Sequence, residues 1–300
     1  MRRVIITGGN GFLGSHLIDR LVQRGVTVHA IANNNHQKLD TLIPPEQIHV
    51  LGSDPYAASE LVIRIQPNVI FHLAAVYAEP TSIECIASMF SGNLSLGAAL
   101  LYGASKCEYP VVFLNTGTYW QFSETGEFSP NTVYASTKQA FQDLLTFYVR
   151  NGSVSATTLV LYDTFGEDDT RSKLWSMLIE SPSGSTIPLS PGEQFIELVH
   201  QSDIVNAFLH AATLLLAQQP LDPVYALRSG TSVRLRDLIL GLNEGANLGL
   251  SLNWGARPYW EGQVLRPWQG PVLPGWRPRV SVLDELIRMA ERRRAEKGIV

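Results

Sequence analysis

Tyr134 and Lys138 lie four residues apart in the segment SPNTVYASTKQAF. On a helix, side chains at this spacing lie on one face, a single turn apart. A free tyrosine has a pKa of about 10, so its phenol transfers protons poorly at neutral pH. A lysine ammonium one turn away would favour the phenolate and lower the tyrosine pKa towards the range in which general acids work. The pair alone fits either a proton-transfer site or an ordinary pair on a helix surface, and the residues before it bear on the choice.

A glycine-rich turn near the start of the chain predicts a dinucleotide site. The apolar residues 4–7 are followed at once by GGNGFLG, and a stretch with helical periodicity begins there. Gly8 and Gly11 would let backbone N–H groups approach a pyrophosphate, and Gly14 would let the helix pack closely on the strand. A strand, a tight turn and a helix in this order are the context that the pattern requires. We therefore expect cofactor contacts from Gly8, Gly11, Phe12, Leu13 and Gly14.

The residues after the second expected strand bear on the identity of the dinucleotide. An NAD-selective site usually carries an Asp or Glu there, which binds the ribose 2′-hydroxyl. Residues 31–38 read IANNNHQK, and the first carboxylate is Asp40. Asn33 and Asn34 could instead donate hydrogen bonds to a 2′-phosphate, although the segment contains no arginine. The segment therefore favours NADP(H) over NAD(H).

The first two-thirds of the chain alternate short β-branched runs with helix-length amphipathic stretches. Strands are expected near residues 3–7, 27–32, 47–51, 69–73, 111–115 and 156–161. Helices are expected near residues 12–24, 55–65, 83–106 and 132–150. Alternation of this kind, with solidly apolar strands, predicts an α/β fold with a Rossmann-type doubly wound parallel sheet.

The pattern becomes irregular after residue 162, which predicts a smaller C-terminal lobe. Helices are expected at 171–180, 202–217 and 280–296, and short strands near 186–189 and 195–199. Residues 245–279 are rich in Gly, Pro and Trp. We expect an NAD(P)-binding domain over residues 1–165, with residues 195–230 returning to its sheet. Residues 166–194 and 231–300 would form a smaller substrate-binding lobe.

Composition argues against several classes of protein. A net charge of −4 over 300 residues gives no electrostatic reason to expect binding to nucleic acid or to an anionic membrane. Cys85 and Cys107 form neither a disulfide framework nor a metal motif, and the seven histidines show no metal-ligand spacing, so no metal site is expected. No apolar run approaches the roughly 20 residues that span a bilayer, and no signal peptide is evident. These features predict a soluble, cytoplasmic protein.

With these motifs the chain resembles the extended short-chain dehydrogenase/reductase family, in its nucleotide-sugar (NAD-dependent epimerase/dehydratase) branch. TGGNGFLGSHL is similar to the family's T-G-x-x-G-[FY]-[LIV]-G, and HLAA at residues 72–75 is similar to its H-x-A-A. The resemblance implies further cofactor contacts from Asp54, Leu73, Ala74, Ala75, Asn93, Tyr134 and Lys138. It also implies a homodimer that pairs through residues 83–106 and 132–150.

The fifth expected strand ends in LNTGTYW, where the family carries a Ser/Thr-rich segment. Thr116 falls on the catalytic Ser/Thr of the family, and a hydroxyl there can bond to a substrate carbonyl oxygen. The 4,6-dehydratases of the family carry an Asp-Glu pair directly after this residue. This chain has Gly117 and Thr118, which cannot do that acid–base chemistry, so the sequence argues against a 4,6-dehydratase. Thr118 is expected to contact the substrate.

The segment DTFGEDDTRSKL, at residues 163–174, resembles that of nucleotide-sugar 4-ketoreductases such as the CDP-abequose synthase group. The resemblance places Thr164, Arg171 and Lys173 near the sugar or diphosphate, although solvated charges at a helix start would also explain the last two. Two arginines common in the family are replaced, one by Ile196 and one by Trp260. Arg257 and Arg266 remain to supply positive charge, since guanidinium groups suit phosphate.

Together with the resemblance, these residues imply NAD(P)H-dependent reduction of a keto group on a nucleotide-activated 6-deoxy or 3,6-dideoxy sugar, at C4. Tyr134 would donate the proton, Lys138 would lower its pKa and bind the nicotinamide ribose, and Thr116 would polarise the carbonyl. The expected partner is a nucleotide-diphosphate sugar. A nucleotide-sugar 4-epimerase with retained NAD would use the same three residues and stays open. A non-catalytic dinucleotide-binding protein is a third interpretation, which the presence of both Tyr134 and Lys138 disfavours.

Overall fold

The computed structural model describes residues 1–32, 36–52, 54–169, 171 and 174–299. The chain forms two compact units, of which the larger comprises Met1–Leu161, Ile204–Leu227 and Gln269–Trp276. The smaller comprises Tyr162–Asp203, Arg228–Trp268 and Arg277–Val300. Each unit has its own hydrophobic core.

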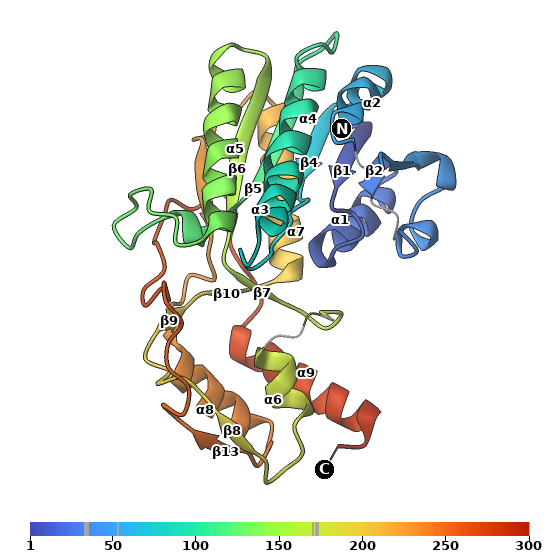
Figure 1. Ribbon diagram of the computed structural model, residues 1–300. Coiled ribbons are helices and arrows are strands. Elements are labelled where there is room, and N and C mark those ends of the chain that lie inside the picture. Colours follow the sequence, from blue (N-terminus) through green and yellow to red (C-terminus); the bar gives the residue numbers. More distant parts are fainter. Residues whose placement is uncertain (33–35, 53, 170, 172–173, 300) are drawn as a thin grey trace. The chain divides into compact units, whose positions relative to one another are not determined.

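A seven-stranded sheet forms the centre of the larger unit, in the order β11-β6-β5-β4-β1-β2-β3 (Figure 1). Its strands are β1 (Arg3–Thr7), β2 (Thr27–Ala32), β3 (Ile48–Val50), β4 (Val69–His72), β5 (Val111–Thr118), β6 (Val154–Leu161) and β11 (Val224–Leu227). All neighbouring strands are parallel. This is the predicted Rossmann-type arrangement, and the strand order reverses between β1 and β4, where such sheets place their ligands.

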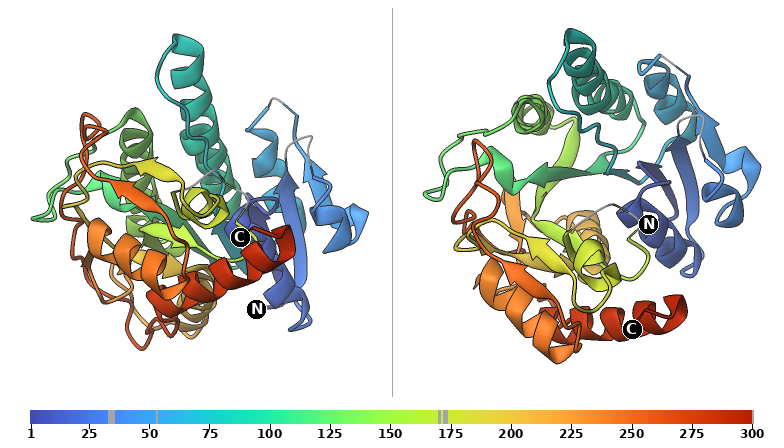
Figure 2. Two further views of the ribbon diagram at one scale, coloured as in Figure 1. Left: turned by 90° about the horizontal axis from the view of Figure 1, so that it is seen from below. Right: turned by 60° about the horizontal axis from the view of Figure 1, so that its bottom comes forward.

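Helices cover both faces of this sheet (Figures 1 and 2). They are α1 (Phe12–Val22), α2 (Ala57–Ile65), α3 (Ile83–Phe90), α4 (Leu96–Ala104), α5 (Val133–Arg150) and α7 (Gln201–Leu216). On one face, α2, α4 and α5 share a core with the sheet in which Leu100, Phe113 and Phe141 are fully buried. On the other face, Phe208 of α7 lies 6.4 Å from Phe71 of β4, measured between ring centroids. Burial on both sides explains the apolar runs VIF in β4 and VVFL in β5, and the polar residues that end both strands are buried as well.

The predicted helix at residues 83–106 forms one continuous helical run with an interruption. Its α3 and α4 segments are joined by a π-helical turn, η3 (Ser91–Ser95). Contrary to the expectation from the sequence, the run Ile83–Ala104 meets the length and composition criteria for a membrane span. A core helix also meets these criteria, and Leu100, Leu101 and Ala104 are buried in the core of the larger unit.

Helix α5 begins at a defined residue. The Thr132 side chain accepts a hydrogen bond of 3.1 Å from the backbone N–H of Ala135, which caps the first turn. The cap fixes the start of the helix so that Tyr134 and Lys138 occupy its first two turns, one turn apart, as predicted.

In its described residues, the smaller unit consists of short paired strands and three packed helices. The elements are β7 (Asp163–Phe165), α6 (Leu174–Glu180), β8 (Thr186–Pro188), β9 (Phe195–Ile196), β10 (Leu198–His200), β12 (Val233–Arg234), α8 (Leu235–Gly245), β13 (Ser251–Asn253) and α9 (Val282–Lys297). Leu178 of α6, Ile239 of α8 and Leu286 of α9 meet in its core. The sequence interpretation did not include α8, although Leu235, Leu238, Ile239 and Leu242 recur there at helical spacing.

Candidate active site

A cavity of about 770 Å³ lies at the carboxyl ends of β1, β2, β3 and β4. Its lining includes six of the residues predicted to bind a cofactor, namely Gly8, Gly11, Asp54, Leu73, Ala74 and Ala75. The volume is in the range of small-molecule and cofactor sites. Segments that are far apart in the sequence therefore form one pocket at the point where the strand order reverses.

At two positions of the turn, Gly8 and Gly14, other backbone atoms lie so close that a Cβ has no room. Gly8 has a φ of 71°, and a Cβ there would lie 2.7 Å from the backbone nitrogen of Ala74. A Cβ on Gly14 would lie 2.1 Å from the carbonyl oxygen of Gly8. The turn thus packs directly against both the end of β4 and the first turn of α1, which leaves the cavity wall open to a flat, extended ligand. This cradle fits a dinucleotide.

The other predicted cofactor residues take different places. Phe12, Leu13 and Gly14 lie in the first turn of α1 and are not among the described residues that line the cavity. Asp54 lines it and accepts a hydrogen bond of 2.8 Å from the backbone N–H of Tyr56. Asn33 and Asn34, like Lys173 of the predicted substrate site, lie outside the described residues.

Asn93 connects the cavity to helix α5. Its side chain is fully buried, accepts a hydrogen bond of 2.7 Å from the Val76 N–H and donates one of 2.8 Å to the Val76 carbonyl. The same amide nitrogen donates to the Thr137 hydroxyl over 3.0 Å, and that hydroxyl donates to the carbonyl of Tyr134 over 2.7 Å. Val76 lines the cavity. Hydrogen bonds therefore fix the Tyr134 turn to the wall of the glycine-lined pocket.

Burial sets the protonation of Tyr134 and Lys138. Lys138 is only 1% exposed, and its Nζ lies 6.0 Å from the centre of the Tyr134 ring. Burial lowers the pKa of Lys138 to about 8 and raises the pKa of Tyr134 to about 12. The expectation that the lysine brings the tyrosine pKa down is therefore corrected, because burial shifts it upwards.

The Thr116 hydroxyl is engaged within the sheet. It lies buried near the end of β5 and donates a hydrogen bond of 2.9 Å to the backbone carbonyl of His72. The imidazole of His72 is also buried and bonds through Nδ1 to the Thr7 hydroxyl over 2.8 Å. Burial, with a smaller effect of Lys138, lowers the pKa of His72 to about 3, so this ring is neutral. To bond to a substrate, the Thr116 hydroxyl has to turn away from the His72 carbonyl.

Thr118 has a structural task at the end of the same strand. Its hydroxyl accepts a hydrogen bond of 3.4 Å from the backbone N–H of Trp120, and Gln121 Oε1 accepts the Thr118 N–H over 2.8 Å. These bonds cap the short helix η4 (Tyr119–Gln121). The predicted substrate contact from Thr118 stays a prediction.

The predicted substrate residues of the smaller unit have distinct surroundings. Arg171 forms a two-pronged ion pair with Asp169, with both N–O distances at 2.6 Å, and donates to the Thr164 hydroxyl over 2.9 Å. The Arg266 guanidinium lies 4.6 Å from the centre of the Phe195 ring. Arg257 lines a cavity of about 620 Å³ within this unit. The structure thus brings Thr164 and Arg171 together and places Arg257 and Arg266 elsewhere in the unit.

Several residues at the site were not predicted from the sequence. Ser88, Ser91 and Gly92 line the glycine-rich cavity from the helical run that contains the π turn. Tyr77 and Trp120 each lie in edge-to-face contact with the ring of Tyr134. A large aromatic residue two positions after the H-x-A-A segment, as at Tyr77, is the signal that could have drawn attention to this contact.

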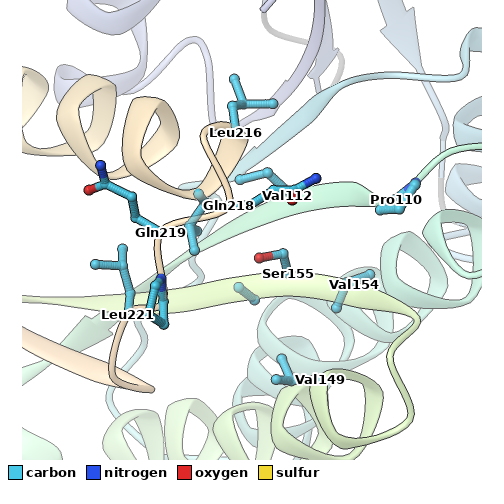
Figure 3. Close-up of a pocket in the computed structure, with 12 residues that line it drawn as sticks. Pro110, Val112, Val149, Val154, Ser155, Leu216, Gln218, Gln219 and Leu221 are labelled. Atoms are coloured by element: carbon cyan, nitrogen blue, oxygen red, sulfur yellow. The ribbon is translucent and has the colours of Figure 1, made fainter.

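A further cavity, of about 440 Å³, lies at the opposite end of the sheet (Figure 3). Val112 of β5, Val154 of β6 and Leu216 of α7 line it, and Ser155, Gln218 and Gln219 are its polar residues. The described residues of this lining include no ionisable side chain, so it offers no acid or base. Across the described part of the chain, no three His, Cys, Asp or Glu side chains are placed to hold a metal ion.

Comparison with known proteins agrees with this geometry. The model of the "NAD dependent epimerase/dehydratase family" matches residues 4–221. The chain is 27% identical to CDP-abequose synthase of Yersinia pseudotuberculosis, over 88% of this chain and 91% of that protein. It is 26% identical to CDP-abequose synthase of Salmonella typhimurium, over 80% of this chain and 79% of that protein. A crystal structure of UDP-glucose 4-epimerase from Thermotoga maritima with UDP-glucose superposes with a TM-score of 0.79, at 22% identity, over 98% of this chain and 99% of that one. That likeness shows the fold, and the family match, which spans most of the chain, shows that the protein belongs to the NAD-dependent epimerase/dehydratase family.

Proposed function

We propose that the protein reduces a keto group, at C4, of a nucleotide-activated deoxysugar, with Tyr134 as the proton donor. The observation that carries the proposal is the hydrogen-bonded connection through Asn93, which holds the Tyr134–Lys138 turn against the glycine-lined cavity. A proton donor and a dinucleotide cradle in adjoining positions are what a carbonyl reductase needs. The two CDP-abequose synthases, which the chain matches over most of its length, support the same substrate class.

The cavity supports a nicotinamide dinucleotide as the cofactor. Gly8, Gly11 and Asp54 would hold it along one wall, and Ala74 and Val76 along the other. When bound, the dinucleotide would supply the hydride. The absence of a carboxylate between Ile31 and Asp40 supports NADP(H) over NAD(H), because a 2′-phosphate would meet no negative charge there.

Three side chains of the site would act on the ketone oxygen or on the proton that it receives. Tyr134 is protonated at neutral pH and can donate its proton to the oxygen of the ketone as negative charge develops there. Lys138 is a cation below a pH of about 8 and would stabilise the phenolate that the tyrosine leaves behind. Thr116, once turned away from the His72 carbonyl, would donate to the same ketone oxygen.

The end of β5 argues against a dehydratase. An acid–base pair of carboxylates at residues 117 and 118 would be needed for elimination at the neighbouring carbons. A Cβ on Gly117 would lie 2.9 Å from Cγ2 of buried Thr158, so an aspartate at this position requires neighbouring atoms to shift. The packing of side chains around Gly117, and not only the residue type, therefore disfavours a carboxylate here.

We also propose that the smaller unit binds the nucleotide part of the substrate, in the cavity that Arg257 lines. The guanidinium of Arg257 would face the diphosphate, and Gln194 and Ser190 of the same lining could bond to the base or ribose. Arg171 is less suited to this role than the sequence suggests, because Asp169 already neutralises its charge. Thr164, whose hydroxyl accepts from Arg171, would at most position that arginine.

The experiment that tests the proposed function follows NADPH absorbance against a panel of CDP-, dTDP-, GDP- and UDP-linked 4-keto-6-deoxyhexoses. A reductase consumes one NADPH for each sugar reduced, and at least one member of the panel should be turned over. The alternative is a 4-epimerase, which the Tyr134, Lys138 and Thr116 set would equally serve. NAD that copurifies with the protein, together with epimerised product and no net NADPH consumption, would establish the alternative instead.

For the assembly and the compartment we propose a cytoplasmic homodimer. Cys85 and Cys107 are free thiols, as in a reducing compartment. Phe90, Tyr102 and Phe147 leave about half of their surface exposed on α3, α4 and α5, which lie on one face of the larger unit. Exposed aromatic residues on neighbouring helices support an interface on this face.

A further inference from the structure

Two aromatic side chains, Tyr77 and Trp120, contact the ring of Tyr134, the proposed proton donor. The Tyr77 and Tyr134 ring centroids are 5.6 Å apart with the planes at 84°, and those of Trp120 and Tyr134 are 6.4 Å apart at 87°. Tyr77 and Trp120 also contact each other, at 6.1 Å and 63°. Each pair has the edge-to-face geometry that aromatic rings prefer. We refer to Tyr77 and Trp120 as the aromatic wall.

The wall is built from two loops that the fold places beside α5. Tyr77 follows the segment 73–76 that lines the dinucleotide cavity, and Asn93 fixes Val76, its neighbour in the chain, through two hydrogen bonds. Trp120 lies in η4, which the Thr118–Gln121 cap holds at the end of β5. Both rings are therefore positioned by elements that also build the proposed site. Even so, 58% of the Tyr77 surface is exposed, which leaves an apolar ring available to a ligand.

We infer that the aromatic wall determines specificity at C6 of the sugar, by accepting a methyl group and disfavouring a hydroxymethyl or carboxylate group. The inference rests on the proposed function, because it assumes that the ketone oxygen meets the Tyr134 hydroxyl. C6 is attached to C5, the direct neighbour of C4. C4 has a second neighbour, C3, and we assign the C5 side of the sugar, which carries C6, to the rings that touch Tyr134.

The chemistry of the wall favours the deoxy carbon. A methyl group loses water-exposed apolar surface against the two rings, which stabilises the complex. A hydroxyl in the same place exchanges its water for ring atoms, and a carboxylate would also lie against the electron-rich ring faces. An apolar pocket discriminates against an added hydroxyl by at most about 100-fold. The expected preference of the wild type for the 6-deoxy substrate is therefore roughly 10- to 100-fold in kcat/KM.

The test compares two substrates that differ only at C6, a nucleotide-linked 4-keto-6-deoxyglucose and the corresponding 4-ketoglucose. Both carry the nucleotide whose ketosugar is reduced in the panel described above. Tyr77→Ser and Trp120→Gln should each reduce the preference to within a few-fold of unity, mainly through a lower kcat/KM for the 6-deoxy substrate. Tyr77→Phe keeps the ring and should keep the preference. Tyr109→Ser, at another tyrosine that is 73% exposed, controls for the loss of a surface ring. Urea unfolding and the Kd for NADPH identify any variant whose fold is damaged.

Failure of the inference and failure of the proposed function give different results. Equal kcat/KM of the wild type for both substrates, or an unchanged preference in Tyr77→Ser and Trp120→Gln, overturns the inference and leaves the reductase in place. If no ketosugar is reduced, the proposed function fails, and binding then tests the wall by itself. Calorimetry with the Tyr134→Phe variant, which retains the ring, should show tighter binding of CDP-6-deoxyglucose than of CDP-glucose. Equal Kd values would overturn the inference.

Discussion

The hydroxyl of Tyr134 lies in surroundings that keep its proton in place. Burial holds its pKa at about 12, whereas burial of Lys138 brings the lysine pKa down to about 8. Both shifts favour the uncharged form, as expected for groups removed from water. A protonated phenol is the form required for reduction, because the proton must move to the forming alkoxide. Oxidation of an alcohol, the first half of an epimerase cycle, would require the phenolate instead.

These protonation states predict a one-sided pH profile for reduction. Lys138 is a cation below a pH of about 8 and loses its proton as the pH rises through that value, whereas Tyr134 stays protonated. The value of kcat/KM for NADPH, which reports groups of the free protein, should be level near pH 7 and fall about tenfold per pH unit above 8. Lys138→Arg should lose activity overall but show no such fall, because a guanidinium remains charged. A wild-type profile that is level up to pH 10 would contradict this role of Lys138.

Residue types and short spacings were enough to propose Tyr134, Lys138 and the glycine turn as site residues, but they could not supply contacts made across the fold. The Thr116 bond to His72 depends on the register of β4 against β5, which pairs His72 with Asn115. The contact between Tyr77 and Tyr134 joins residues with no local pattern in common. The upward pKa shift of Tyr134 depends in the same way on burial, which only the packed structure reveals.

At the scale of elements, the turn between β1 and α1 is the segment whose residue types are most restricted by packing, because Gly8 and Gly14 have no room for a Cβ. The apolar pattern of the sequence predicted β1, α1 and the later strands of the sheet. The predicted bounds of β1 and α1 agree with the observed ones to within a few residues, because each element has a clear apolar pattern. The π turn at Ser91–Ser95 could not be predicted, since its sequence, SGNLS, has no distinguishing pattern. Yet this turn contains Asn93, whose buried hydrogen bonds connect Val76, in the lining of the glycine-rich cavity, to α5. Short local irregularities of this kind are common at functional sites.

Two glycines with the same backbone conformation allow the role of the turn to be measured. Gly8 and Gly25 have φ angles of 71° and 70°, but a Cβ on Gly25 has nothing within 4 Å. Gly25→Ala should therefore cost only the conformational strain, about 1–2 kcal/mol in the free energy of unfolding. Gly8→Ala adds a clash with the Ala74 backbone, so it should cost clearly more and weaken NADPH binding at least tenfold. Urea unfolding and calorimetry measure both effects, and equal costs would show that the approach of the turn to β4 is unimportant.

At the scale of the whole molecule, the proposed function assigns a different role to each unit. The larger unit carries out the reduction, and the smaller unit binds the nucleotide part of the substrate. The larger unit holds the glycine cavity, Tyr134, Lys138 and Thr116, all at the carboxyl end of one parallel sheet. The smaller unit holds the Arg257 cavity. The parallel sheet could be predicted from the alternation of apolar strands with amphipathic helices in the sequence. The smaller unit was harder to predict, because its strands are only two or three residues long. Such strands carry no periodicity of their own.

The exposed aromatic residues of α4 and α5 predict the assembly state. Sedimentation of the wild type should give twice the mass of the chain. Replacing Tyr102 and Phe147 together by Lys should yield the monomer, with the dimer weakened at least 100-fold, because aromatic residues at an interface centre contribute most of its binding energy. Leu265→Lys, at an exposed leucine of the smaller unit, should remain dimeric. A wild type that sediments as a monomer at micromolar concentration would contradict the proposed interface.

The most direct test of the proposed reaction follows the reducing hydrogen itself. The protein is incubated with the nucleotide-4-keto-6-deoxyhexose that is turned over and with NADPH that carries deuterium at both C4 positions of the nicotinamide. The sugar is then analysed by mass spectrometry and NMR. We predict one deuterium at C4 of the sugar for each NADPH consumed. In Tyr134→Phe we predict a rate that is lower by about 100- to 10,000-fold, with NADPH affinity nearly unchanged. A product without deuterium at C4, or a Tyr134→Phe variant with undiminished turnover, would contradict the assignment of Tyr134 as the acid of a 4-ketoreductase.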